Sequence, residues 1–414
     1  MIQLATTTES LNTFKISDYL DVTNNNNTTT NKNDKITNEN NRSFKFSFER
    51  WFGTNTLNQP STTTQRIYTR HQYYANGIEK LEEIQAVMIV LHGYGEHCTC
   101  KTVQKISGIM NMENIVVYSF NCRLFNKCIR VTITEEDSHE KIEDIRMNIN
   151  FEQALMDIAS AIEDVSICFP AFKFPNLKIL LLGYSIGATL GMQFLTTTSL
   201  FDKIPDKRLN GLILISPFIY HGLEDEKSQT LEKTSEWTQP SETWSSYFLK
   251  KASYWIPNYQ MLHFEKEKIK KDFSKDSELL EMLENDPVIR ENASFHSVSP
   301  SSYHLLPPCT AIFAQQTLEA MKEIEKVLSE KIVSLSRKSN NLRVLFLHGI
   351  NDALSPVVNS SIKWHQALNQ QAEFNNISSQ LILYENRKHY FLLDRESEQV
   401  FNDMVQFIKS HCLN

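Results

Sequence analysis

The chain has 414 residues, of which 41% are hydrophobic and 22% are charged, and its net charge is −7. That length allows one large domain or two ordinary ones, with a core that needs no disulfide bonds. The mildly acidic balance argues against a nucleic-acid surface, which usually carries a basic patch. No apolar run approaches the roughly 20 residues of a membrane-spanning helix.

The cysteines and the N-terminal sequence indicate the cellular compartment of the protein. The N-terminal region has no apolar stretch of signal-peptide length, so we expect no secretion signal. The seven cysteines are scattered, and no His or Cys set near Cys98 and Cys100 completes a zinc site. We therefore expect reduced thiols and a cytoplasmic location, with no bound metal or cofactor.

Residues 1–62 differ in composition from the rest of the chain. Segments 24–30 and 38–41 are rich in Asn and Thr, and such tracts have too few apolar side chains to offset the entropy of ordering them. We expect a low-complexity, disordered tail. Within it, residues 43–52 alternate apolar and polar side chains and are expected to dock on the domain as an edge strand.

Structure begins with a predicted strand at 66–74, followed by the turn Asn76-Gly77. In the later predicted strands the side chains that point to either face are apolar, which is typical of a parallel sheet covered by helices on both faces. Segments with helical periodicity lie between and after these runs. The alternation predicts an α/β fold with a mostly parallel central sheet. In chain order, strands are expected at 86–91, 114–120, 177–182, 211–215, 342–347 and 380–384, and helices at 101–112, 151–169, 186–197, 357–371 and 396–411.

Two insertions interrupt this alternation. Residues 126–150 are polar and charged and are expected to form a surface excursion. The stretch between 216 and 342 has no convincing core strand, but it has charge-rich helical patterns and a long amphipathic helix at 316–337. We expect that stretch to be an inserted helical cap. The expected organisation is a core at 63–216, a cap at 217–339 and the rest of the core at 340–414.

A serine between two glycines follows the predicted strand 177–182. The sequence Gly183-Tyr184-Ser185-Ile186-Gly187 connects that strand to the next helix, which is the context of a nucleophile elbow. Glycines are needed there because the strand and helix backbones nearly touch, and the chain has only 11. The helix N-terminus favours developing negative charge. The pattern predicts Ser185 as a nucleophile; an ordinary strand-to-helix turn is the alternative.

The sequence His92-Gly93-Tyr94-Gly95-Glu96-His97 follows the strand at 86–91. A glycine-rich loop in this place can turn backbone N–H groups toward the oxyanion of a tetrahedral intermediate. We expect the backbone amides of Tyr94 and Ile186 to be the donors. His92, Glu96 and His97 also allow a metal-binding interpretation, but no further ligand cluster accompanies them, so we expect them to support the loop.

The histidines late in the chain compete for the role of general base. In a fold of this kind the nucleophile, the acid and the base follow in that order, and beyond the segment 348–352 the chain has only His365, His389 and His411. His365 lies within a predicted helix, and His411 lies at the last turn of one, where a cation is favourable. His389 follows the strand 380–384 in a loop. We predict His389 as the base.

Asp352 follows the strand 342–347 in the sequence His348-Gly349-Ile350-Asn351-Asp352. An acid in this place holds the imidazole in one tautomer and stabilises the imidazolium. The alternative role is a cap for the next helix, but Ser355-Pro356 already provides that start. We predict Asp352 as the acid.

These motifs together resemble the monoglyceride lipase and lysophospholipase branch of the α/β-hydrolases. That resemblance runs from residue 66 to the C-terminus and implies the α/β-hydrolase fold, with a cap after the sixth core strand. It implies Ser185 as nucleophile, Asp352 as acid and His389 as base, with Tyr94 and Ile186 as oxyanion donors. The motifs that carry it lie at 92–97, 183–187, 348–352 and 388–389, with further similarity at 151–158, 256–262, 285–287 and in the final helix.

The chain departs from that family at the loop 119–126, which has no glycine where the family has a D-x-x-G-x-G-x-S sequence. Ala188 replaces a third elbow glycine, and Asn386 stands where a glycine often precedes the histidine loop. None of these changes falls on a predicted catalytic residue. The loop forms one wall of the entrance, so the departures affect the choice of substrate more than the chemistry.

The sequence thus predicts a cofactor-independent serine ester hydrolase that cleaves a monoacylglycerol or lysophospholipid through an acyl-enzyme. The alternatives are a non-catalytic binding protein of the same fold, and a short-ester esterase or serine peptidase. Aromatic cap residues can line an acyl pocket or form the cap's own core, and the segment 244–255 can contact a membrane. These aromatics are Tyr220, Trp237, Trp244, Tyr247, Phe248, Tyr254, Trp255 and Tyr259.

Overall fold

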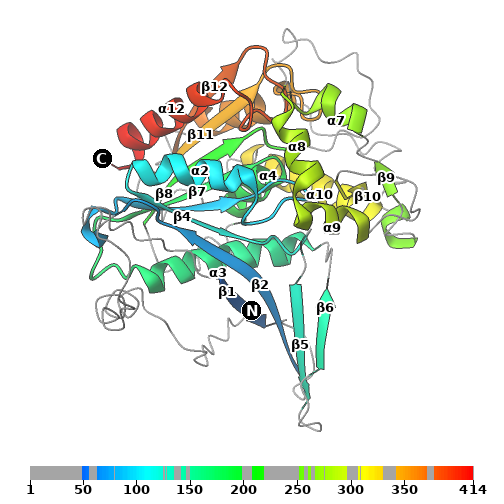
Figure 1. The fold of residues 1–414 in the computed structure, drawn as a ribbon. Coiled ribbons are helices and arrows are strands. Elements are labelled where there is room, and N and C mark those ends of the chain that lie inside the picture. The colour runs from blue at the N-terminus through cyan, green and yellow to red at the C-terminus, as the bar shows by residue number, and fades with distance from the viewer. Residues whose placement is uncertain are drawn as a thin grey trace, which may run out of the picture.

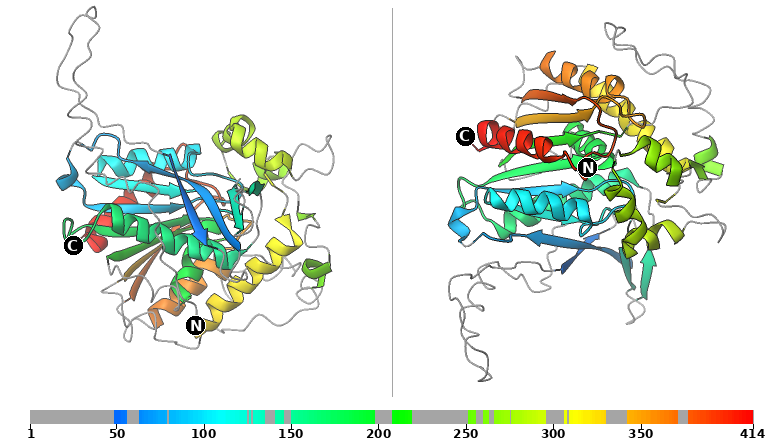
Figure 2. Two further views of the ribbon diagram at one scale, coloured as in Figure 1. Left: turned by 90° about the horizontal axis from the view of Figure 1, so that it is seen from below. Right: turned by 45° about the horizontal axis from the view of Figure 1, so that its top comes forward.

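A computed structural model gives the fold (Figures 1 and 2). It describes residues 49–55, 63–78, 80–124, 126, 128–134, 141–145, 150–197, 208–218, 251–255, 260–262, 266–274, 276–295, 306, 307, 309–329, 342–370 and 377–413.

The core is a sheet that has ten strands in the described part of the chain. Six of them are parallel neighbours, and the rest continue the sheet antiparallel beyond β4. The central strands β3 and β4 are buried along their whole length, which explains their continuous apolar sequences. Across the sheet the order is β12 (Ile377–Tyr384), β11 (Leu342–Gly349), β8 (Leu209–Ile215), β7 (Lys178–Tyr184), β3 (Ala86–Leu91), β4 (Ile115–Phe120), β2 (Thr63–Tyr74), β5 (Cys128–Thr134) and β6 (Lys141–Ile145), with β1 (Glu49–Asn55) paired to β2.

Helices cover both faces of the sheet (Figures 1 and 2). On one face α2 (Lys101–Met112) lies beside α12 (Glu398–Phe407), and Lys105 of α2 reaches Ser397 and the Phe401 ring. On the other face lie α3 (Phe151–Cys168), α4 (Ile186–Thr196), α10 (Ala311–Ser329) and α11 (Lys363–Gln370). α4 contacts α3 and α10, and α10 also contacts α11. The predicted α/β fold with a mostly parallel sheet is confirmed.

The elements differ from the predicted ones in a few places. The insertion 126–150, expected as a surface excursion, contains two strands that were not predicted, β5 and β6, which form a hairpin beside β2 (Figure 1). The helix predicted at 357–371 is a π-helical segment, η5 (Val358–Ile362), followed by α11, and the final helix ends in a similar segment, η6 (Ile408–Cys412). Of the expected tail, residues 49–55 form β1, and the remainder lies outside the described residues.

The inserted region contributes several elements at the carboxyl ends of the parallel strands (Figure 1). The amphipathic helix α8 buries Leu279, Met282 and Leu283. The predicted long helix begins earlier, at Ala311, as α10, and packs on the core helices α4 and α11. Residues 330–337 of its predicted length lie outside the described residues. The other elements are α7 (Lys266–Asp272), α8 (Glu278–Asn285), α9 (Pro287–Phe295) and the small sheet of β9 (Gln260–Leu262) and β10 (Cys309–Thr310).

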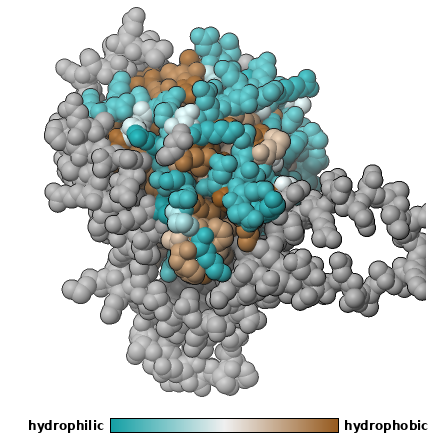
Figure 3. All heavy atoms as spheres, turned by 90° about the vertical axis from the view of Figure 1, so that its left-hand side faces the viewer, coloured by the Kyte–Doolittle hydropathy of each residue, from teal (hydrophilic) through white to brown (hydrophobic). Residues whose placement is uncertain are grey.

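The face of the molecule away from the cap mixes hydrophilic and hydrophobic surface, with apolar atoms in patches between polar ones (Figure 3). Within the described residues, no helix combines the length and the apolar composition that crossing a membrane requires.

Candidate active site

Ser185 stands between β7, which ends at Tyr184, and α4, which begins at Ile186. Its backbone is in the left-handed region, with φ 55° and ψ −125°, a conformation that is strained for a non-glycine residue and is typical of functional sites. A Cβ atom on Gly187 would lie 2.2 Å from the carbonyl oxygen of Leu91. A Cβ atom on Gly183 would lie 2.3 Å from the carbonyl oxygen of Gly187. The close approach of strand and helix that the sequence suggested is therefore present.

The three side chains predicted as nucleophile, base and acid form one hydrogen-bonded chain. Ser185 Oγ lies 2.8 Å from His389 Nε2, and His389 Nδ1 lies 2.7 Å from Asp352 Oδ2. All three residues are buried. Because a carboxylate only accepts, Nδ1 carries the proton and Nε2 is the acceptor for the serine hydroxyl. This is the arrangement that proton abstraction from a serine needs.

Asp352 is held from four directions. Its Oδ1 accepts hydrogen bonds from the backbone amides of Leu354 and Ser355, each at 2.9 Å. Its Oδ2 accepts from His389 and from His348, whose Nε2 lies 2.9 Å away. Burial alone would raise the pKa of Asp352, but the two histidines outweigh it and hold that pKa well below its usual range. The carboxyl group is therefore ionised wherever the protein is folded near neutral pH.

Backbone contacts join the loops that carry the acid and the base. The amide of Asn351 donates to the carbonyl of Arg387 at 2.9 Å. A Cβ atom on Gly349 would lie 2.4 Å from that same carbonyl oxygen. Asn386 has φ 57°, a conformation that asparagine tolerates better than most residues. These features fix how His389 faces Asp352.

The loop after β3 carries the first predicted oxyanion donor. Gly93 N donates to Glu96 Oε2 at 3.0 Å, and the ring of Tyr94 packs against Phe313 with centroids 4.8 Å apart. Tyr94 lines the same pocket as Ser185. Ile186 is the first residue of α4, where helical N–H groups have no intrahelical acceptor. The role of these two amides stays a prediction.

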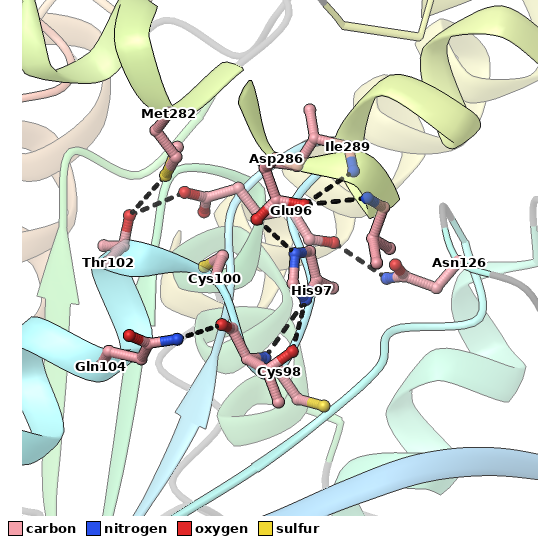
Figure 4. Close-up of polar contacts among 12 residues, drawn as sticks. Glu96, His97, Cys98, Cys100, Thr102, Gln104, Asn126, Met282, Asp286 and Ile289 are labelled. Atoms are coloured by element: carbon pink, nitrogen blue, oxygen red, sulfur yellow. Dashed lines mark hydrogen bonds and ion pairs between the residues drawn. The ribbon is translucent and has the colours of Figure 1, made fainter. Parts of the chain in front are cut away.

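The polar residues of this loop bind other parts of the protein (Figure 4). His92 Nε2 accepts from the amide of Cys122 at 2.9 Å, and burial lowers the pKa of His92 to about 4. His97 Nε2 lies 2.8 Å from Asp286 Oδ2, and Asp286 Oδ1 accepts from backbone amides at the start of α9. These contacts favour loop support over metal binding. In the part of the chain that the structure describes, no three His, Cys, Asp or Glu side chains are grouped to hold a metal ion.

Glu96 is the most connected side chain of the loop. Its carboxyl group accepts hydrogen bonds from the hydroxyls of Tyr184, Tyr390 and Thr102 as well as from Gly93 N. It is buried, and burial raises its pKa against the opposing effect of these four donors. The sequence did not reveal these partners, of which Tyr184 and Tyr390 come from distant segments.

The glycine-free loop after β4 packs directly on the loop that follows β3. Asn121 Oδ1 accepts from the amide of Cys98 at 2.9 Å, and Asn126 Nδ2 donates to the carbonyl of Glu96 at 3.0 Å (Figure 4). Arg123 forms a buried ion pair with Asp157 of α3. Side-chain amides and an ion pair therefore hold this loop in place.

A pocket that is partly open to solvent lies above Ser185 and His389. The rings of Phe218 and Phe273 stand edge-on to the His389 imidazole, with centroids 6.3 and 6.1 Å away. Apart from the serine, the histidine and Glu96, the lining is mostly apolar. It consists of Gly93, Tyr94, Glu96, Ser185, Phe218, Phe273, Leu279, Met282, Leu283, Leu306, Cys309, Phe313, Leu354, His389 and Tyr390.

Several solved structures align with this chain. A soluble variant of monoglyceride lipase from Saccharomyces cerevisiae, in complex with a substrate analog, aligns with a TM-score of 0.52 at 12% identity, over 88% of this chain and 95% of that one. A monoacylglycerol lipase from Paleococcus ferrophilus aligns with a TM-score of 0.48 at 17% identity, over 78% and 94%. A carboxyl esterase from Bacillus coagulans in complex with glycerol aligns with a TM-score of 0.46 at 14% identity, over 88% and 99%.

The family follows from the sequence itself. No curated protein matches the chain. A family model described as serine aminopeptidase, S33, matches residues 82–396, a span that contains all five predicted site residues. The expected membership of the α/β-hydrolases is confirmed, and the chain belongs to the serine aminopeptidase S33 family of hydrolases.

Proposed function

We propose that the protein is a serine ester hydrolase that cleaves a monoacylglycerol or a lysophospholipid through an acyl-enzyme on Ser185. The observation that carries this proposal is the 2.8 Å contact between Ser185 Oγ and an imidazole whose other nitrogen lies 2.7 Å from the Asp352 carboxylate. An arrangement of this kind activates a serine hydroxyl for attack on an acyl carbonyl.

The proposed reaction has two stages. Ser185 Oγ bonds to the acyl carbonyl carbon while His389 Nε2 takes the hydroxyl proton, and the amides of Tyr94 and Ile186 donate to the resulting oxyanion. Collapse of this intermediate breaks the bond to the glycerol or phosphoglycerol oxygen, which receives the proton from His389. A water molecule, deprotonated by His389, then attacks the acyl-enzyme and releases the fatty acid.

The pocket supports a lipid acyl group as the part of the substrate that it recognises. Leu279, Met282, Leu283 and Phe313 are buried and line the cavity beside the nucleophile. Such a lining gains free energy from every methylene that it removes from water, about 0.8 kcal/mol for each. A fatty-acyl chain therefore suits this cavity better than a short polar acid.

Aminopeptidase activity is the second candidate, because the matching family is described by that activity. A free substrate α-amino group needs an acidic acceptor in the site. Among the described lining residues the only carboxyl group is that of Glu96, and four donors already occupy it. This observation favours an ester over an aminoacyl substrate.

Turnover of a substrate panel by the purified protein tests the proposal. The panel contains 2-oleoylglycerol, oleoyl lysophosphatidylcholine, p-nitrophenyl butyrate and alanine p-nitroanilide. We expect the largest kcat/KM for one of the oleoyl esters and none for the Ser185→Ala variant. Preference for the anilide would support a peptidase, preference for the butyrate a short-ester esterase, and absence of all turnover a binding protein.

We further propose a cytoplasmic enzyme whose cap touches the membrane that supplies its substrate. Tyr254 and Trp255 are 81% and 75% exposed, and Lys251 precedes them on the same short helix. Exposed aromatics beside a cation suit a membrane interface. The six cysteines described by the structure are free thiols, which supports a reducing compartment. The other aromatics predicted for the cap lie outside the described residues.

Sedimentation with vesicles tests this membrane contact. We expect Tyr254→Ser/Trp255→Ser to bind less to vesicles that contain anionic lipid, while the kcat for p-nitrophenyl butyrate stays unchanged. Equal sedimentation of the variant and the unchanged protein would contradict the contact.

A further inference from the structure

A second histidine contacts the predicted catalytic acid. His348 lies near the end of β11, four residues before Asp352, and its side chain is fully buried. Its Nε2 is 2.9 Å from Asp352 Oδ2, the oxygen atom that also accepts from His389 Nδ1. Two imidazoles therefore share one carboxylate oxygen, one from the end of β11 and the other from the loop after the neighbouring strand β12.

The surroundings of His348 determine which of its nitrogens carries a proton. Nε2 faces two atoms that can only accept, Asp352 Oδ2 at 2.9 Å and the carbonyl oxygen of Ser355 at 3.0 Å. Nε2 must therefore be protonated. Nδ1 lies 2.7 Å from the hydroxyl of Ser361, which can donate to it. The imidazole is thus held at both nitrogens, in an orientation that points its N–H at the acid.

We infer that His348 is a positioning residue for the catalytic acid. Its N–H fixes Asp352 Oδ2 in the place where His389 Nδ1 meets it, while the amides of Leu354 and Ser355 fix Oδ1. Without this N–H, Oδ2 keeps only its hydrogen bond to His389. The carboxyl group can then rotate about the two hydrogen bonds that Oδ1 accepts from the amides of Leu354 and Ser355. A tilted carboxylate then holds the base less well toward Ser185.

Two substitutions separate the two hydrogen bonds of His348. Glutamine places an N–H donor near the position of Nε2, so His348→Gln keeps the bond to Asp352 and loses the bond to Ser361. Asparagine reaches only the position of Nδ1, so His348→Asn keeps a partner for Ser361 and loses the bond to Asp352. The two variants are matched in polarity and differ in which neighbour, Asp352 or Ser361, keeps its hydrogen bond.

The activity assay uses p-nitrophenyl butyrate and rests on the proposed function. We expect His348→Asn to lower kcat about tenfold, a part of the roughly 10⁴-fold that the acid is worth in such triads, with KM unchanged. We expect the kcat of His348→Gln to stay within about threefold of the kcat of the unchanged protein. A purely structural role for His348 would lower kcat equally in both variants, or in neither, and either result would overturn the inference.

A second measurement needs no substrate and no stable variant. In protein labelled with ¹⁵N-histidine, NMR should show His348 protonated at Nε2, and a low-field proton for the His389 Nδ1–H bond to Asp352. A proton on Nδ1 of His348 with Nε2 bare would overturn the inference, because that tautomer cannot donate to Asp352. If the protein has this tautomer but no esterase activity, the proposed function fails and the positioning role stands.

Discussion

The carboxyl group of Glu96 accepts a hydrogen bond from the hydroxyl of Tyr390, the residue that directly follows His389 in the chain. The same carboxyl group binds Tyr184, which precedes Ser185, and the amide of Gly93, which precedes Tyr94. One buried side chain therefore connects the neighbours of the predicted base, nucleophile and oxyanion donor. We expect the three loops to depend on it for their relative positions.

This connection predicts energetic coupling between Glu96 and the two tyrosines. Tyr390→Phe should lower the free energy of unfolding by about 1–3 kcal/mol, because it removes a hydrogen bond to a buried charged group. In the Glu96→Gln background the same change should cost less, by at least about 0.5 kcal/mol. Denaturant unfolding of the four proteins of this double-mutant cycle measures the difference. Strict additivity would show that the two side chains do not act together.

The lowered pKa of the buried His92 predicts that the protein loses stability in acid. Burial lowers its pKa to about 4 in the folded protein, against about 6.5 for an exposed histidine. The unfolded chain therefore binds one more proton between these values, so this contribution to stability is complete above about pH 6.5 and falls as the pH drops toward 4. The difference corresponds to roughly 3 kcal/mol.

A variant without the titrating group checks this effect. In His92→Gln, a side-chain oxygen can still accept from the amide of Cys122, but it does not titrate. The loss of unfolding free energy between pH 7.5 and pH 4.5 should therefore be smaller in His92→Gln than in the unchanged protein. His411→Gln, at an exposed site near the C-terminus, is the control. An equal acid loss in both variants would refute the assignment to His92.

Two glycine substitutions of equal size should have opposite effects. Gly187→Ala would bring a Cβ atom to 2.2 Å from the carbonyl oxygen of Leu91, which is backbone and cannot rotate away. We expect a loss of about 3 kcal/mol of unfolding free energy and of esterase activity, since this overpacking separates the elbow from β3. Gly108 of α2 is exposed and has no atom within 4 Å of an added Cβ. Gly108→Ala should stabilise the helix by roughly 0.5–1 kcal/mol. Thermal unfolding of both variants shows whether the signs differ.

The parallel strands were predictable because burial on both faces makes their sequences continuously apolar, as in β3 and β4. β5 was missed although Ile129, Val131 and Ile133 alternate with polar residues. An antiparallel strand at the side of a sheet shows only this weaker, two-residue period, and the surrounding charged residues dominated the composition of the insertion.

In the candidate site, too, some residues could be predicted from the sequence and others could not. Ser185 and His389 could be proposed from sequence because each follows a strand at the carboxyl edge of the sheet, where such residues must gather. Asp352 followed from the same reasoning. The partners of His348 and Glu96 could not be predicted, because they depend on how side chains meet across folded loops. Glu96 and Tyr390 are 294 residues apart in the chain.

Labelling with a fluorophosphonate probe is the measurement that tests the central claim most directly, since such probes react covalently with an activated serine. Mass spectrometry of the labelled protein should show one adduct, located on the peptide that contains Ser185. Labelling should be absent from Ser185→Ala and strongly reduced in His389→Gln, while both variants remain folded. An adduct at another residue, or labelling that persists in Ser185→Ala, would contradict the assignment of Ser185 as the nucleophile.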